Sequence, residues 1–170
     1  MSRQGCMILW SLGNPAQVQT EEVGRNLRSA ILQHPTLGIT EPRLSPNGKW
    51  IVFRVGADLH YAPFHGDQPI GEKEWVKLAG RAGYPFWSPG GRNLYYAALH
   101  EEGSDQMVVL RQPFDPATGR LNRAAVAFYS LKGLILGSPI VNQVIGAPGG
   151  VVLGLMEESS DIWVQDLVKH

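Results

Sequence analysis

Three short motifs that combine proline and glycine set the strongest limit on how this chain folds. They are Ser45-Pro46-Asn47-Gly48, Ser88-Pro89-Gly90-Gly91 and Ala147-Pro148-Gly149-Gly150. Proline fixes φ at the second position of a tight turn, and glycine accepts the left-handed conformation that ends it. Each motif precedes an apolar run, so each predicts a turn between two antiparallel strands. We therefore expect Gly48 and Gly91 to have positive φ.

The segments around each turn predict strands in a repeated order. The second strand of each unit is apolar on successive residues, which is typical of a strand covered on both faces. A third strand follows each hairpin, and a weaker fourth strand closes two of the units. The expected strands are 42–44, 50–53, 58–64 and 75–78; 85–87, 94–96, 105–110 and 125–129; and 140–145, 151–153 and 161–167.

The spacing of the turns favours a β-propeller. The first two motifs are 43 residues apart, which suits a four-stranded blade of about 40–50 residues. The next spacing, 59 residues, is stretched by longer loops such as 112–122. The predicted fold is all-β: a partial propeller of about three four-stranded antiparallel blades, incomplete at both ends. Its parts are 1–40 (half a blade plus a linker, with strands near 7–12 and 29–32), 41–80 (a blade), 81–131 (a blade) and 132–170 (an incomplete last blade).

The N-terminal part is the least regular. Residues 7–12 resemble the third strand of a blade without a hairpin before it, and residues 29–32 could be the matching fourth strand. Between them, residues 21–29 are expected to form an exposed loop rather than a helical turn.

These repeats resemble the TolB-type propeller, a WD-repeat-like family whose blades carry Ser-Pro-Asp-Gly turns. Residues 42–53 and 84–96 match that pattern, and 144–155 match it in spacing only. Asn47 and Gly90 stand where the family usually has Asp. Residues 58–80 and 161–164 are similar to propellers of bacterial signalling proteins, where the propeller follows a kinase or DNA-binding domain. Complete members have six or more blades, so the resemblance allows this chain to be a fragment, and it allows either a cytoplasmic or a periplasmic location.

Composition excludes several classes of function. Lys and Arg number 15 and balance 15 Asp and Glu, which argues against a nucleic-acid-binding protein. The single Cys6 excludes an intrachain disulfide and a multi-cysteine metal site. No apolar run reaches the roughly 18 residues of a membrane span, and residues 1–12 lack a signal-peptide pattern.

Motifs for catalysis and cofactors are also missing from the sequence. There is no Gly-x-Ser-x-Gly elbow and no phosphate-binding loop, so we expect neither enzymatic activity nor a cofactor. His60 and His65 lie near Glu72 and Glu74, but a metal site needs three or four converging ligands, and packing is the favoured role of His60. The acidic segments 101–105 and 157–161 are expected to be solvated hairpin tips rather than calcium loops.

Aromatic residues fall into two groups. Those on predicted strands are expected to pack between blades: Trp50, Phe53, Tyr61, Phe86, Trp87, Tyr95, Tyr96 and Trp163. Trp10, Phe64 and Trp75 lie nearer strand ends and are candidate binding residues, because Trp and Tyr often anchor interfaces. A rim of this kind suits a peptide or a sugar equally well.

The sequence therefore predicts a non-catalytic propeller for protein–protein interaction, sensing or scaffolding. The alternatives are a carbohydrate-binding propeller and a vestigial domain of an enzyme. Three blades cannot close a ring, so the chain could associate with a second copy. Two copies could close one ring of six blades, each lending its N-terminal strands to the other's last blade, unless the missing blades belong to a longer chain.

Overall fold

The computed structural model describes residues 7–13, 16–22, 27–99, 107–130, 135–136, 144–147, 150–153 and 155–156. Within these ranges the regular structure is β-strand, apart from the short 3₁₀ helix η1 (Glu72–Glu74). The strands form antiparallel sheets, of which the three largest have three or four strands each. The expectation of an all-β, antiparallel fold is confirmed.

The first sheet contains a strand that the sequence analysis missed. It is built in the order β1 (Met7–Gly13), β2 (Ala16–Glu22) and β3 (Leu27–Gln33). The expectation of a loop over 21–29 was wrong at both ends, because β2 and β3 extend into it. Strand β2 is rich in polar residues, and only Val18 gives it an apolar signal, so its place in the middle of the sheet comes from backbone pairing on both sides.

The second and third sheets share one connectivity, with strands paired in chain order. The second contains β4 (Ile39–Leu44), β5 (Trp50–Val55), β6 (Asp58–Pro63) and β7 (Val76–Ala79). The third contains β8 (Ala82–Trp87), β9 (Asn93–Leu99), β10 (Met107–Pro113) and β11 (Val126–Ser130).

The remaining described strands form two short pairs. Strand β12 (Ile135–Leu136) pairs with β15 (Leu155–Met156), and β13 (Val144–Ala147) pairs with β14 (Gly150–Leu153). The second pair joins the expected strands on either side of the third turn motif. Pro148 and Gly149 of that motif, and the strand expected at 161–167 with Trp163, lie outside the described residues.

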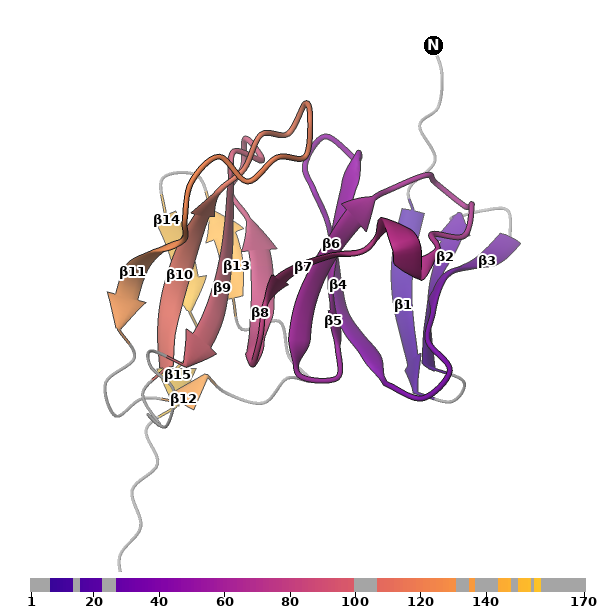
Figure 1. Cartoon of the computed structure of the whole chain (residues 1–170), viewed down its shortest axis with the longest axis horizontal. Coiled ribbons are helices and arrows are strands. Elements are labelled where there is room, and N and C mark those ends of the chain that lie inside the picture. Colours follow the sequence, from indigo (N-terminus) through magenta and orange to yellow (C-terminus); the bar gives the residue numbers. More distant parts are fainter. Residues whose placement is uncertain are drawn as a thin grey trace, which may run out of the picture.

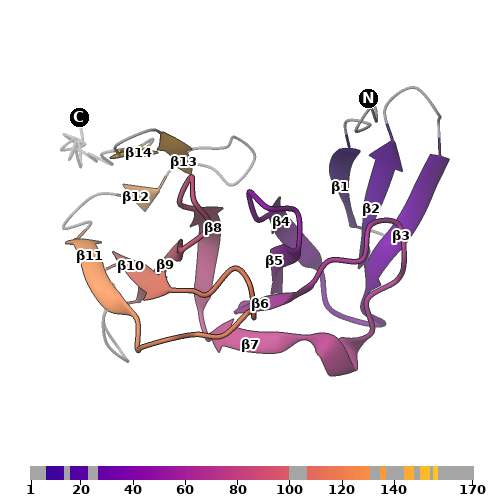
Figure 2. The ribbon, with the colours of Figure 1, turned by 90° about the horizontal axis from the view of Figure 1, so that it is seen from above.

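The sheets stand side by side, as Figure 1 shows. Seen from above, the first strands β1, β4, β8 and β13 follow one another along one side, while β3, β7 and β11 lie at the outer rim (Figure 2). Contacts join β1 to β4, β4 to β8 and β8 to β13. The likeness of residues 7–12 to a third strand was therefore misleading, because β1 is the first strand of its sheet and lies next to β4.

Two apolar clusters lie between neighbouring sheets, and β5 contributes to both. Ile51 and Phe53 belong to the first core, between the first and second sheets, and Val52 belongs to the second core, between the second and third sheets. Successive residues of a strand point to opposite faces. This alternation explains why the strand is apolar on consecutive residues, as expected for a strand covered on both sides.

The first two turn motifs adopt equivalent conformations. Gly48 has φ 67° and Gly91 has φ 68°, so the prediction of positive φ at both is confirmed. The amide of each glycine donates to the carbonyl of the serine three residues earlier, at 2.9 and 2.8 Å. The hydroxyl of each serine accepts a further bond at 3.0 Å, from the amide of Trp50 for Ser45 and of Asn93 for Ser88.

Candidate functional site

Strands β4 and β8 each carry a β-bulge at the same position of the repeat. Within these bulges Glu41 has φ 56° and Tyr84 has φ 55°, and each residue precedes a proline and lies four residues before the serine of its turn. A non-glycine residue in this left-handed region costs about 1–3 kcal/mol unless its surroundings hold it there. Bulges of this kind re-aim side chains and often lie beside functional sites. This pair of bulges is the candidate site.

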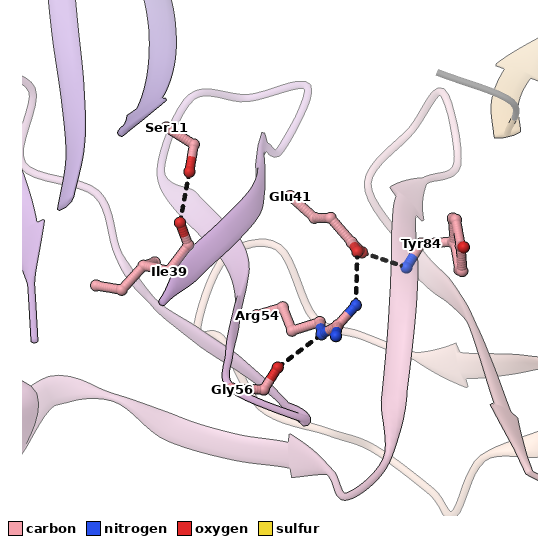
Figure 3. Close-up of polar contacts among 6 residues, drawn as sticks. All are labelled: Ser11, Ile39, Glu41, Arg54, Gly56 and Tyr84. Carbon is pink, nitrogen blue, oxygen red and sulfur yellow. Dashed lines mark hydrogen bonds and ion pairs between the residues drawn. The ribbon is translucent and has the colours of Figure 1, made fainter. Parts of the chain in front are cut away.

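Glu41 links the two bulges through its carboxylate. Its Oε1 accepts a bond from Arg54 Nη1 at 3.0 Å, and its Oε2 accepts the backbone N–H of Tyr84 in the next sheet (Figure 3). Arg54 is held in turn by the carbonyl of Gly56, 2.8 Å from its Nε. Only 10% of the Glu41 side chain is exposed. The glutamate therefore satisfies a backbone donor of β8 that the bulge withdraws from pairing.

Gly83 leaves the room for this carboxylate. A Cβ atom at position 83 would lie 3.2 Å from Glu41 Oε2, closer than most such contacts. The absence of a side chain at Gly83 therefore lets Glu41 approach the backbone of β8.

Two further bonds connect the first strands of neighbouring sheets. The Ser11 hydroxyl on β1 donates to the carbonyl of Ile39 on β4 (Figure 3), and Trp87 Nε1 on β8 donates to the carbonyl of Arg43, 3.3 Å away. Side chains of β1 and β8 thus bond to backbone carbonyls of β4. We call Ser11, Ile39, Glu41, Arg54 and Tyr84 the inner-strand bracket.

Two titratable groups near the bulges have shifted pKa values. Burial and the neighbouring Glu41 raise the pKa of the Tyr84 phenol, so this group stays protonated at neutral pH. Burial lowers the pKa of Arg43, and Glu41 partly opposes that effect, but a guanidinium stays charged in proteins at neutral pH.

The loop after β10 holds the first turn motif. Asn47 Nδ2 and Trp50 Nε1 each donate to the carbonyl of Pro116 at 3.0 Å, and the Tyr61 hydroxyl donates to the carbonyl of Gly119 at 3.1 Å. Asp115 organises this loop by accepting bonds from Thr118 and from the amide of Ala117, and the first of these bonds is the main cause of its lowered pKa. The turn at 45–48 is thus part of the contact between the second and third sheets.

An aromatic cluster lies beneath this loop. The ring of Phe114 meets Trp50, Tyr61 and Trp87 edge-on, with centroids 5.6, 5.5 and 4.9 Å apart. The sequence predicted that Trp50, Tyr61 and Trp87 pack between sheets. Phe114 was not singled out, although its place just before the Asp115-Pro116 turn was a usable signal.

The structure describes the side chains of two of the three candidate binding aromatics. Phe64 and Trp75 are half-buried and pack against the first core. Trp75 also meets Phe53 edge-on at 5.0 Å and donates from Nε1 to the carbonyl of Ile70, 3.3 Å away. The side chain of Trp10 lies outside the described residues. A binding role for these residues stays a prediction.

The histidines considered for a metal site make separate contacts. His60 stacks on Phe53 with centroids 6.1 Å apart, and burial is the main cause of its lowered pKa. His65 Nε2 lies 3.0 Å from Glu74 Oε2, and the resulting bond lowers the pKa of Glu74. Across the described ranges no three His, Cys, Asp or Glu side chains are grouped so that they could hold a metal ion.

No family model matches the chain, and no curated protein matches it. In the part of the chain that the structure describes, no helix is long and apolar enough to cross a membrane.

Proposed function

We propose that this chain is a propeller-type, non-catalytic module that binds a protein partner and serves in sensing or scaffolding. The observation that carries the proposal is the structural repeat of the second and third sheets. They share strand order, the bulges at Glu41 and Tyr84, and the turns that end at Gly48 and Gly91. Repeats stacked about an axis use such turns to present loops and strand edges to partners.

The arrangement of the sheets supports a TolB-type propeller that is open in this chain. First strands lie next to one another on one side, and last strands lie at the rim (Figure 2). Blades that close such a ring come either from a second copy or from further sequence in a longer protein. Donation of β1 and β3 to a second copy would first require them to leave β2, which pairs with both. Closure by docking of whole sheets is therefore the favoured form of self-association.

A protein partner is favoured over a carbohydrate. Sugar sites need aromatic faces open to solvent, whereas Phe64 and Trp75 pack against the first core. The polar groups of the inner-strand bracket are held by bonds to one another, which suits a scaffold of fixed shape. We also propose that the chain has no catalytic role and needs no cofactor.

Selection of peptides displayed on phage, run beside a glycan array, tests this function. We expect a family of related peptides that bind the purified chain saturably, and no glycan whose binding falls on Trp75→Ala. We expect no hydrolase, kinase or oxidoreductase turnover from the same preparation. Saturable glycan binding that Trp75→Ala removes, or turnover that a point mutation abolishes, would contradict the proposal.

A further inference from the structure

Asn47 is the one asparagine in the sequence that precedes a glycine. Asparagine is chemically labile, and glycine, having no Cβ, leaves its own amide open to reaction with the side chain before it. In deamidation the Gly48 nitrogen gives up its proton and bonds to Asn47 Cγ, while the Cγ–Nδ2 bond breaks and ammonia leaves with that proton. Water then opens the cyclic imide to give aspartate or isoaspartate. Asn47 is exposed to solvent, so water can reach it.

Hydrogen bonds within the turn oppose this reaction. The Gly48 N–H donates to the Ser45 carbonyl, 2.9 Å away, so the nitrogen that must attack is engaged on the backbone. Asn47 Oδ1 accepts bonds from the Ser45 hydroxyl at 2.7 Å and from the Lys49 amide at 3.1 Å. These bonds hold the side-chain amide and the attacking nitrogen in place, and both groups must be released before a bond forms between them.

A bond to the loop after β10, residues 115–120, adds to this restraint. Asn47 Nδ2 donates to the carbonyl of Pro116 at 3.0 Å, and the indole of Trp50 donates to the same oxygen. Because Nδ2 is the nitrogen that leaves in deamidation, the loop holds the leaving group itself. The equivalent position of the second turn motif is Gly90, which has no side chain to make such a bond. The restraint by the loop therefore belongs to the first turn motif.

We propose that Asn47 is a deamidation site whose reaction is controlled by the loop 115–120. While the loop binds Nδ2 the reaction is slow, and each local opening of the loop allows it to proceed. The aspartate product has no N–H to donate to the carbonyl of Pro116, and the isoaspartate product adds an atom to the backbone of the turn. Neither product can restore the original contact. Deamidation therefore turns a reversible opening between the second and third sheets into a permanent loss of one bond.

Peptide mapping by mass spectrometry measures the reaction in the full chain, incubated at one temperature in mildly alkaline buffer. The variant Gly90→Asn provides the matched site, because it places a second asparagine before glycine at the same position of an equivalent turn. No described atom lies within 4 Å of the Cβ position of Gly90. Asp115→Ala loosens the loop by removing its bonds to Thr118 and Ala117. Ser11→Ala, which removes a bond between the first and second sheets, controls for a general loss of stability.

In Gly90→Asn, the introduced asparagine is expected to deamidate about fivefold faster than Asn47 of the same molecules, which is the factor that one hydrogen bond supplies. Asp115→Ala should accelerate the reaction at Asn47 by a similar factor, and Ser11→Ala should leave its rate within about twofold of that in the native chain. Equal rates at the two sites of Gly90→Asn would overturn the inference. So would a rate at Asn47 that Asp115→Ala raises no more than Ser11→Ala does.

Discussion

The two interfaces between the three large sheets differ in the types of side chain and hydrogen bond that form them. The first, between the β1–β3 and β4–β7 sheets, has mainly aliphatic buried residues, such as Val18, Ile31 and Leu32. Its aromatic side chains are Phe53, Phe64 and Trp75. The described bond that joins their first strands is the one from Ser11 to Ile39. The second, between the β4–β7 and β8–β11 sheets, combines an aromatic cluster with several bonds to backbone carbonyls.

This difference between the interfaces indicates which of them fixes the relative orientation of its two sheets. Aliphatic packing is non-directional and tolerates changes of shape when volume is kept. Edge-on rings and hydrogen bonds fix both distance and orientation. The second interface joins two copies of one structural unit, so the bulge of one copy can bond to the bulge of the next. We therefore expect point changes at the second interface to be less well tolerated.

The largest effect is expected from Phe114→Ala. This buried ring is the centre of the aromatic cluster, and its loss should lower the free energy of unfolding by about 3–5 kcal/mol. Chemical denaturation followed by tryptophan fluorescence measures the change. Phe128→Ala is the matched control, because its ring is 49% exposed. Similar losses for the two variants would show that the cluster is not a core.

Gly119→Ala is expected to have the next largest effect, lowering the free energy of unfolding by about 3 kcal/mol. Gly119 has φ 74°, and a Cβ there would lie 2.0 Å from the Trp50 ring. The new methyl group must displace the ring from the carbonyl of Pro116 that it binds. Gly90→Ala serves as control, because nothing lies within 4 Å of its Cβ position. A thermal melt in which the two variants behave alike would contradict the contact between loop and turn.

The two polar links between first strands should differ in strength. Glu41→Ala removes the carboxylate that accepts bonds from the Arg54 guanidinium and the Tyr84 amide. It is expected to lower the free energy of unfolding by about 2 kcal/mol. Ser11→Ala removes one neutral bond at the first interface and should cost about 1 kcal/mol or less. Equilibrium denaturation of both variants provides the comparison. A larger cost for Ser11→Ala would reverse the ranking of the interfaces.

The smallest effect is a pH dependence at the first interface. His60 stacks on Phe53, and burial holds its pKa below the 6.5 of an ordinary histidine, with Asp58 and Lys77 nearby acting in opposite directions. The unfolded chain therefore binds a proton more readily than the native one. Protonation of His60 should therefore lower the stability of the fold as pH falls through about 6.5, and His60 should have no such effect above that value.

Thermal melts at about pH 7.5 and pH 5.5 measure this contribution as the difference between the native chain and His60→Phe, which keeps a ring in place. A melting temperature that falls equally in both proteins on acidification would place the effect elsewhere.

Strands of the second and third sheets and their turns were predictable, because proline and glycine mark tight turns and doubly buried strands are apolar throughout. Strand β2 was not, because pairing on both sides stabilises a polar sequence. The bulges were missed because positive φ at Glu41 and Tyr84 has no direct signature in residue type. The signal available was a residue followed by proline at both positions, Glu41-Pro42 and Tyr84-Pro85, 43 residues apart.

The Glu41 carboxylate joins the second sheet to the third through the backbone of Tyr84. Hydrogen exchange of the Tyr84 amide, measured by NMR in the native chain and in Glu41→Ala, tests it directly. The amide should exchange slowly in the native chain and far faster in the variant, while the amide of Leu94 within the third sheet stays protected. Equal exchange of the Tyr84 amide in both proteins would show that Glu41 does not hold the two sheets together.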